Sequence, residues 1–340
     1  MPEESTVDHA KSVLDRRRLL AGGTALAASA LPVKAADGGQ PDIIAEEHWA
    51  QKGAVQLYLY RKRVVGDGPD DKPVLFLAHG STFSGRGGFD LHVPGIPNYS
   101  FMDEFARRGF DVWTMDFENY GRSSRNTGTN SDIMSGVADM EAAFPIIESI
   151  TGQTSFRVKG QSAGAIRAGV FANKHPERVE RLILDAFTWT GEGAPEIMRR
   201  RRDVAQYEAS PTRPLTRATL EGIFSRDDPS TFDPAVPEAL ADYELALGNT
   251  APTGTYIDMA IHMPMVDPTR ILCPVMIHRA ETDGNATDAE LLEFFGKLPN
   301  PDKQFVKLRG IAHVAVLGKN RHRTWHVMAS FLTLPGLAKA

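Results

Sequence analysis

Blocks of hydrophobic and polar residues alternate along the chain from about residue 42. Pro73–Ala78 is a continuous apolar run, which is typical of a parallel strand buried on both faces. Phe101–Gly109 has apolar residues at helical spacing and ends at a glycine, and Phe110–Phe117 predicts the next strand. Residues 55–60 alternate apolar and polar positions, as a half-exposed antiparallel leading strand would.

The same alternation of strand and helix continues further along the chain. Helical spacing predicts helices over 139–150, 163–174 and 324–332, and apolar runs predict strands over 156–159, 181–185, 275–278 and 304–308. Strands that follow helices at short, regular intervals indicate a largely parallel sheet. We therefore expect an α/β protein whose core comprises residues 37–187 and 269–340.

The alternation fails between residues 188 and 268. This segment is rich in proline and contains the basic run Arg199–Arg202. A long stretch without strands inside a compact domain needs a role, so we expect a helical cap inserted between two strands. The basic run is interpreted as a solvated helix face in preference to an attractor of anionic substrates. Side chains that either form an apolar, aromatic-accepting pocket or pack the cap onto the core are Trp189, Tyr207, Phe224, Tyr256, Met259, Met263 and Met265.

The first 36 residues have the pattern of an export signal. Arg16-Arg17-Arg18 precedes Leu19-Leu20 and a short apolar run rich in glycine and alanine, with a candidate cleavage site at Val33-Lys34-Ala35. This resembles a bacterial twin-arginine signal, which implies transient contact with that export machinery and a periplasmic or secreted protein. The run is shorter than the roughly 18 apolar residues that a membrane span needs.

Composition adds few constraints. The 340 residues carry 38 Lys and Arg against 43 Asp and Glu, a formal charge of −5, so no broad cationic face for nucleic acid is implied. The one cysteine, Cys273, cannot form an internal disulfide and is interpreted as a small buried hydrophobe.

The strongest chemical signal is the sequence Gly160-Gln161-Ser162-Ala163-Gly164. It fits G-x-S-x-G and lies between a predicted strand and a predicted helix, which is the context of a nucleophile elbow. The flanking glycines allow the close backbone approach that such a turn needs. Ser162 is therefore the candidate nucleophile.

A serine hydroxyl needs a neighbouring base, and the base needs an acid that orients it. Asp283 and His313 follow the strands predicted at 275–278 and 304–308, in the order Ser, Asp, His that this elbow requires. Asp185, at the end of another strand, and Glu281 remain alternative acids. Four other histidines are weaker candidates for the base: His278 within a strand, His262 in the cap, and His322 and His326 on one helix. For the pair His322 and His326, a packed or solvated role is favoured over a metal site.

A tetrahedral intermediate needs two backbone N–H donors for its oxyanion. One is expected from Ala163, the residue after the nucleophile. The other is expected from Ser81, in the loop His79-Gly80-Ser81-Thr82 that follows the buried strand. A simple strand-ending turn is the alternative interpretation of His79-Gly80.

Taken together, these motifs resemble the α/β-hydrolase family of serine esterases and lipases over about residues 45–335. Besides the elbow, the resemblance includes His79-Gly80, Gly310-x-x-His313, and the segment Asp116–Ser124, which departs from the family's D-x-R-G-x-G-x-S turn at Glu118 and Asn119. The resemblance implies an eight-stranded, mostly parallel sheet, a cap between its sixth and seventh strands, and acyl chemistry without a cofactor or metal. Serine in the elbow argues against haloalkane dehalogenases and epoxide hydrolases, which carry Asp there.

The sequence therefore predicts a hydrolase that cleaves a small ester-like substrate, apolar or aromatic, through an acyl-enzyme on Ser162. The same three residues serve lactonases, amidases, C–C hydrolases and acyltransferases, so these remain alternatives. A periplasmic ligand-binding or sensor protein on the same fold is the alternative outside enzymes. Neither the substrate nor the oligomeric state follows from the sequence.

Overall fold

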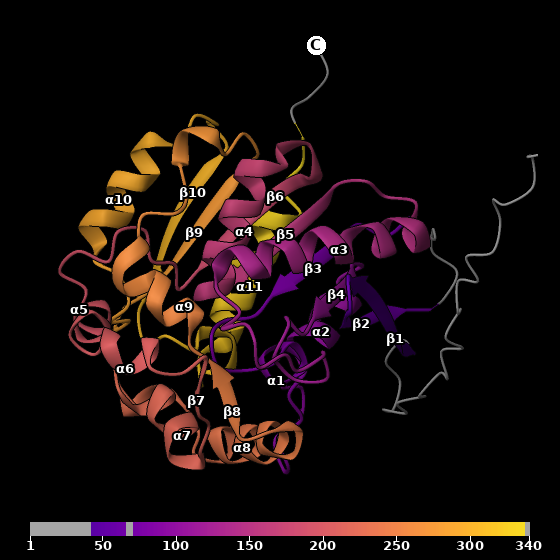
Figure 1. Ribbon diagram of the computed structural model, residues 1–340. Coiled ribbons are helices and arrows are strands. Elements are labelled where there is room, and N and C mark those ends of the chain that lie inside the picture. The colour runs from indigo at the N-terminus through magenta and orange to yellow at the C-terminus, as the bar shows by residue number, and fades with distance from the viewer. Residues whose placement is uncertain (1–41, 66–70, 337–340) are drawn as a thin grey trace, which may run out of the picture.

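The computed structural model describes residues 42–65 and 71–336 (Figure 1). At its centre is an eight-stranded sheet with the strand order β1-β2-β4-β3-β5-β6-β9-β10. The strands are β1 (Ile43–Lys52), β2 (Val55–Val64), β3 (Val74–Ala78), β4 (Asp111–Met115), β5 (Phe156–Gln161), β6 (Val179–Asp185), β9 (Val275–Ala280) and β10 (Lys303–Leu308). β2 pairs antiparallel with β1 and with β4, and all other pairs are parallel, so the prediction of a mostly parallel sheet is confirmed.

The beginning of the sheet differs from the prediction. The strand predicted at residues 55–60 is preceded by β1, so β2 lies inside the sheet, and its residues 57–61 are all buried. The prediction that residues 55–60 form a half-exposed leading strand was therefore wrong. The description fits β1, whose residues are mostly partly or fully exposed.

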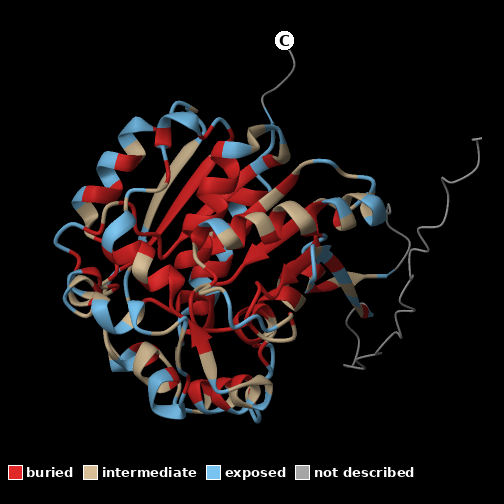
Figure 2. Ribbon diagram, in the orientation of Figure 1, coloured by how far each residue is buried: buried red, intermediate tan, exposed pale blue. Residues whose placement is uncertain are grey.

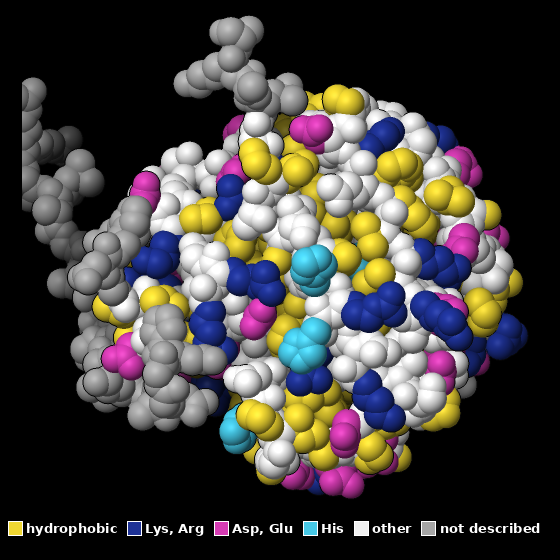
Figure 3. All heavy atoms as spheres, turned by 180° about the vertical axis from the view of Figure 1, so that it is seen from behind, with side chains coloured by type: hydrophobic (Ala, Val, Ile, Leu, Met, Phe, Trp, Pro, Cys, Tyr) yellow, Lys and Arg dark blue, Asp and Glu magenta, His cyan; other side chains and the backbone are white. Residues whose placement is uncertain are grey.

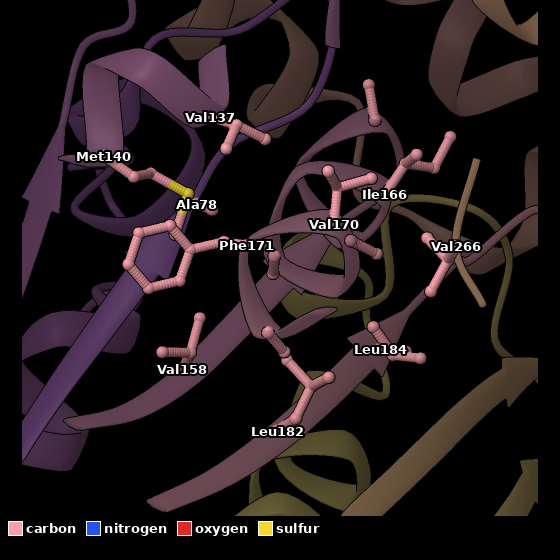
Figure 4. Close-up of a cluster of buried hydrophobic side chains, with 14 of the residues drawn as sticks. Ala78, Val137, Met140, Val158, Ile166, Val170, Phe171, Leu182, Leu184 and Val266 are labelled. Carbon is pink, nitrogen blue, oxygen red and sulfur yellow. The ribbon is translucent and has the colours of Figure 1, made fainter. Parts of the chain in front are cut away.

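Helices cover both faces of the sheet (Figure 1). One face packs against α3 (Ile133–Thr151), α4 (Ala163–Lys174) and α10 (Asp288–Lys297), and the other against α2 (Phe101–Arg107) and α11 (Arg321–Leu332). Figure 4 shows Phe171 of α4 among Met140, Val158 and Leu182, all of which are fully buried. Two large apolar clusters therefore bury the helices against the sheet, and exposed positions lie mainly on the outer helix faces (Figure 2).

Helix ends follow their capping residues. Gly109 ends α2 with a φ of +90°, and Gly152 ends α3 with a φ of +72°, both values that favour glycine. α3 begins six residues before the predicted start at Asp139, because the Asp132 side chain accepts a hydrogen bond from the N–H of Ser135 and caps the helix.

The segment 188–268 lies between β6 and β9, the sixth and seventh strands of the sheet in chain order. It is mostly helical but does contain two strands, each of three residues, which pair antiparallel, so the expectation of a strandless stretch was wrong. Its elements are α5 (Pro195–Arg202), α6 (Val204–Glu208), β7 (Thr212–Pro214), α7 (Arg217–Ser225), α8 (Ala235–Leu247), β8 (Thr250–Pro252), α9 (Gly254–Ile257) and short 3-10 or π turns at Pro229–Thr231 and Asp258–His262. We call residues 188–268 the inserted segment.

The surface shown in Figure 3 carries Lys and Arg side chains interspersed with Asp, Glu and uncharged groups. Cys273 is buried, and burial raises the pKa of its thiol to about 12. Among the described residues, no helix is long and apolar enough to cross a bilayer. The predicted export signal, residues 1–36, lies outside the described residues.

Candidate active site

Ser162 occupies the sharp turn between β5 and α4. Its backbone has a φ of +56° and a ψ of −124°, a conformation that L-residues rarely adopt. The turn is held by a hydrogen bond of 2.9 Å from the Ser162 N–H to the Asp185 carbonyl oxygen at the end of β6. The neighbouring strand thus stabilises a backbone that local preferences disfavour.

Glycines make this turn possible. A Cβ atom at Gly160 would collide with the carbonyl oxygen of Gly164, and one at Gly164 would collide with the carbonyl oxygen of Ala78. A Cβ atom at Gly80 would lie 3.2 Å from the Cβ of Ser162. The elbow therefore needs glycine on both sides of Ser162, and a side chain at Gly80 would require its neighbours to shift by a few tenths of an ångström.

The structure brings Asp283 and His313 together. Asp283 follows β9 and His313 follows β10, and because these strands are parallel neighbours their carboxyl ends meet at one edge of the sheet. His313 Nδ1 lies 2.9 Å from Asp283 Oδ1, and both side chains are almost fully buried.

The environment of Asp283 favours its ionised form. Burial alone would raise the pKa of this carboxyl, but the charge and contact of His313 outweigh burial, with help from Arg226 and from the Asn285 N–H, which donates to Oδ1 at 2.9 Å. The pKa of Asp283 is therefore held well below its usual range. A permanent negative charge beside Nδ1 is what a positioning acid supplies to a general base.

The two alternative acids have other partners. Asp185 is fully buried, with Lys159 Nζ 2.9 Å from Oδ2 and His278 Nδ1 2.8 Å from Oδ1. Glu281 lies at the surface, where its Oε2 accepts a hydrogen bond of 2.8 Å from the Gly310 N–H. Of the three carboxylates, Asp283 is the one beside His313.

The loop after β3 carries the predicted oxyanion donor Ser81. His79 is buried, and burial lowers the pKa of its ring to about 3, so the ring is neutral. Its Nε2 accepts from the Phe117 N–H at 3.1 Å, which leaves Nδ1 as the donor to the Gly80 carbonyl oxygen at 2.8 Å. The loop is thereby tied to the sheet next to Ser162.

Ser81 itself is held on two sides. Its carbonyl oxygen accepts hydrogen bonds from the Tyr120 hydroxyl at 3.1 Å and from Arg213 at 2.9 Å, and its hydroxyl accepts one from Thr255 at 2.9 Å. The other predicted donor, Ala163, is the first residue of α4, where backbone N–H groups have no intrahelical acceptor. The positive end of the α4 dipole therefore also points at the site.

A pocket of about 480 Å³, including its open mouth, adjoins these residues. Ser162, Ser81 and His313 line it together with residues of the inserted segment. The lining comprises His79, Gly80, Ser81, Thr82, Phe83, Gly88, Phe89, Gln161, Ser162, Arg200, Ile223, Arg226, Tyr256, His313 and Val314.

Most of the aromatic and methionine side chains proposed for the pocket are packing residues. Trp189, Phe224 and Met259 belong to the buried cores, and Tyr207 packs edge-on against Tyr256 at 5.1 Å. Tyr256 alone of that set lines the pocket among the described residues. Arg200, which we expected on a solvated helix face, is instead 2% exposed and lines the pocket.

The remaining histidines lie away from this pocket. His278 is buried in β9 as predicted, His262 is paired with Asp258 at 2.8 Å, and the ring of His322 packs on Trp325. Within the described ranges, no group of three or more His, Cys, Asp or Glu side chains is arranged to hold a metal ion.

The turn after β4 shows how its departures from the family pattern are accommodated. Asn119 stands where glycine is usual and adopts a φ of +70°, which asparagine tolerates better than most residues. Its Nδ2 donates to the carbonyl oxygens of Asn126 and Thr129 and to the Ser131 hydroxyl. Glu118 forms an ion pair of 2.8 Å with Lys52.

A mostly parallel eight-stranded sheet with a serine in a strained turn between strand and helix defines an α/β-hydrolase. Residues 97–319 match the family described as serine aminopeptidase, S33, and the chain belongs to this family. No curated protein sequence matches the chain.

Solved structures with the same fold include three hydrolases. E-2-(acetamidomethylene)succinate hydrolase has 17% identity and a TM-score of 0.60, over 85% of this chain and 99% of that one. A thermophilic esterase from Thermogutta terrifontis has 17% identity and a TM-score of 0.60, over 84% and 98%. A 2-hydroxy-6-oxo-6-phenylhexa-2,4-dienoate hydrolase from Rhodococcus sp. strain RHA1 has 17% identity and a TM-score of 0.60, over 86% and 100%. At such identities the likeness concerns the fold.

Proposed function

We propose that this protein is a serine hydrolase that cleaves a carboxylic ester through an acyl-enzyme on Ser162. The observation that carries the proposal is the 2.9 Å contact between His313 Nδ1 and Asp283 Oδ1 at a pocket that Ser162 and His313 both line. A base oriented by a buried carboxylate, next to a serine in a strained turn, is the arrangement that activates a hydroxyl for attack on an acyl carbon.

In the proposed reaction, His313 takes the proton of the Ser162 hydroxyl as its oxygen attacks the ester carbonyl carbon. The N–H groups of Ser81 and Ala163 bind the oxyanion, and His313 then protonates the leaving alcohol. Water, activated by the same histidine, hydrolyses the acyl-enzyme and releases the acid. Asp283 orients His313 and stabilises its positive charge, and no cofactor takes part.

We assign the inserted segment the role of a cap. Four of its residues line the pocket together with residues of the sheet edge: Arg200, Ile223, Arg226 and Tyr256. The cap also favours an ester hydrolase over an aminopeptidase. An aminopeptidase has to bind a substrate ammonium group, yet none of the described residues that line this pocket is Asp or Glu, and two are arginines.

The test combines labelling with a substrate panel. A fluorophosphonate probe should label the wild-type protein at Ser162, and Ser162→Ala should lose both the label and ester hydrolysis. Esters, lactones, amides and vinylogous diketones, with and without alcohol acceptors, separate the proposed activity from lactonase, amidase, C–C hydrolase and acyltransferase activities. Undiminished hydrolysis by Ser162→Ala would overturn the proposal, and binding without turnover across the panel would favour a ligand-binding protein.

We also propose that residues 1–36 direct export by the twin-arginine pathway to the periplasm or beyond. The support is the sequence Arg16-Arg17-Arg18-Leu19-Leu20 followed by the short apolar run. Replacing Arg16 and Arg17 by lysine should keep the protein in the cytoplasm of a bacterial host, as cell fractionation would reveal. An unchanged periplasmic yield would contradict this assignment.

A further inference from the structure

Arg200 differs from its neighbours in the basic run of α5. It is buried and lines the same pocket as Ser162, whereas Arg199, Arg201 and Arg202 are partly or fully exposed. Helical geometry explains the difference, because consecutive residues are about 100° apart around the axis and only one of the four faces the pocket. The run is therefore one inward-facing arginine with three outward-facing neighbours.

Arg200 forms no salt bridge among the described residues, and the carboxylate of Glu196, one turn earlier on α5, acts on its charge only from beyond ion-pair distance. Its Nη1 donates to the thioether sulfur of Met259 at 3.1 Å, and its buried Nε has no hydrogen-bond acceptor. By contrast, Arg199 pairs with Glu196 at 2.9 Å, and Arg201 pairs with Glu192 at 2.7 Å. An uncompensated buried cation is unfavourable, and a thioether is a weak acceptor, so this guanidinium is suited to binding an anion that enters the pocket.

The surroundings of Tyr256 show that this side of the pocket is strongly positive. The guanidinium carbon of Arg200 lies 4.4 Å from the centre of its ring, and that of Arg213 lies 4.3 Å away. Burial alone would raise the pKa of the Tyr256 hydroxyl, but Arg213, Arg200 and Arg226 together lower it to about 7. Negative charge is therefore stabilised at this side of the pocket.

Of the two guanidinium groups on the pocket wall, only that of Arg200 is in no salt bridge among the described residues. Arg226 also lines the pocket, but its charge is shared with Asp227 at 3.3 Å and Glu196 at 3.5 Å. The lining also includes the apolar side chains of Phe83 and Phe89. A planar guanidinium fork matches a carboxylate, which carries one charge and two oxygens.

We propose that Arg200, with Tyr256 beside it, forms a carboxylate subsite in the pocket, so that the preferred substrates are esters that also carry a free carboxylate. This inference rests on the proposed ester hydrolase function and adds its substrate class. The expected substrate is a monoester of a dicarboxylic acid, or an ester whose alcohol part bears a carboxylate, with an apolar spacer between the two groups.

Matched pairs of esters test the proposal. One pair places the carboxylate in the acyl part, para-nitrophenyl hydrogen glutarate against para-nitrophenyl pentanoate. The other places it in the alcohol part, para-carboxybenzyl butyrate against para-methylbenzyl butyrate. In at least one pair, the wild-type kcat/KM should be about 10- to 100-fold higher for the carboxylated member, as a charge-assisted hydrogen bond provides.

Variants assign that preference to Arg200. In Arg200→Met the ratio of kcat/KM within the pair should fall toward one, and in Arg200→Lys it should be intermediate, because an ammonium keeps the charge but not the planar fork. Arg202→Met is the matched control, since Arg202 lies on the same helix but is exposed, and it should keep the wild-type ratio.

The possible failures are distinguishable. If neutral esters are hydrolysed and neither pair shows a preference, or if Arg200→Met keeps the wild-type ratio, the carboxylate subsite is wrong while the ester hydrolase stands. If no ester is hydrolysed and Ser162 is not labelled, the proposed function itself fails. Should Arg200→Met not fold, inhibition of the wild type decides: free glutarate should compete with para-nitrophenyl pentanoate, and absence of competition would overturn the subsite.

Discussion

Gly80 and Ser162 are in such close contact that the loop after β3 and the turn after β5 form one unit. A Cβ atom at Gly80 would lie 3.2 Å from the Ser162 Cβ and 3.3 Å from the Gln161 carbonyl oxygen, closer than ordinary van der Waals contact. Any shift of either backbone therefore changes the distance between the proposed nucleophile and the proposed oxyanion donor at Ser81.

Gly80→Ala should therefore lower kcat for a simple ester by about 10-fold or more, because sub-ångström displacement of reacting groups is costly. Steady-state kinetics measures the effect. Gly222→Ala in α7 is the control, since a Cβ atom there has no other atom within 4 Å. Equal kcat values for Gly80→Ala and Gly222→Ala would show that the close contact does not matter for turnover.

Asp283→Asn should lower kcat by about 10³- to 10⁴-fold with little change in KM, because the amide no longer stabilises the charge on His313. Glu281→Gln, two residues earlier, should keep wild-type kinetics, since its side chain contacts the Gly310 N–H and not His313. A larger loss in Glu281→Gln than in Asp283→Asn would reverse the assignment of the acid.

Asp185→Asn, by contrast, should lower the stability of the folded protein. It would leave the fully buried Lys159 without its 2.9 Å ion-pair partner, and breaking a buried pair typically costs about 3–5 kcal/mol of unfolding free energy. Denaturant unfolding gives the value. Wild-type stability in this variant would mean that the Lys159 charge finds another partner.

Glu244 in α8 should make stability depend on pH. Burial raises the pKa of its carboxyl to about 8, and its Oε1 accepts hydrogen bonds from the N–H and hydroxyl of Ser84. The folded protein then holds one proton more than the unfolded chain between about pH 4.5 and 8. The contribution of Glu244 to the free energy of unfolding is therefore greatest below about pH 4.5. It decreases as the pH rises from there to about 8, by up to about 1.4 kcal/mol per pH unit.

Glu244→Gln tests this pH dependence, because glutamine keeps the acceptor but does not titrate. Relative to the wild type, this variant should gain stability as the pH rises from 5 to 8, as urea unfolding at several pH values would show. Glu238→Gln, at an exposed position of the same helix, should parallel the wild type. Parallel curves for all three proteins would contradict a raised pKa at Glu244.

Replacing Asn119 by glycine should lower the free energy of unfolding less than replacing it by alanine. Both changes remove the hydrogen bonds that Nδ2 donates and the one that Oδ1 accepts from the Asn126 N–H, but alanine must also adopt a φ of +70°. We expect losses of about 1–2 kcal/mol for Asn119→Gly and about 2–4 kcal/mol for Asn119→Ala, measured by denaturant unfolding. The reverse order would mean that backbone strain is not important at this turn.

The parts of the fold that local pattern determines were predictable. Pro73–Ala78 and Ala163–Lys174 match β3 and α4 closely, since a central strand is apolar throughout and the helix starts at a recognisable turn. β1 was missed because an edge strand exposes much of its side-chain surface, so Glu46, Glu47 and His48 conceal its strand character.

The candidate site, like the fold, was predictable from the sequence only in part. Three of its residues, Ser162, Asp283 and His313, each follow a strand of the parallel sheet. Because the carboxyl ends of such strands meet at one edge, the sequence alone indicated that these three residues lie close together. Arg200 and Tyr256 lie in the inserted segment, where burial depends on how short helices pack against one another. A run of four arginines gives no local signal for which member points inward.

The positive φ of Ser162 also has a consequence for attempts to make the protein more robust. A backbone in this region costs about 1–3 kcal/mol for a residue with a Cβ atom, more than the roughly 0.5–1 kcal/mol that glycine's extra unfolded-state freedom costs. Ser162→Gly should thus resist heat better than the wild type while lacking the reactive hydroxyl. Directed evolution that selects for heat resistance alone would enrich this inactive variant, so a screen for turnover has to accompany it.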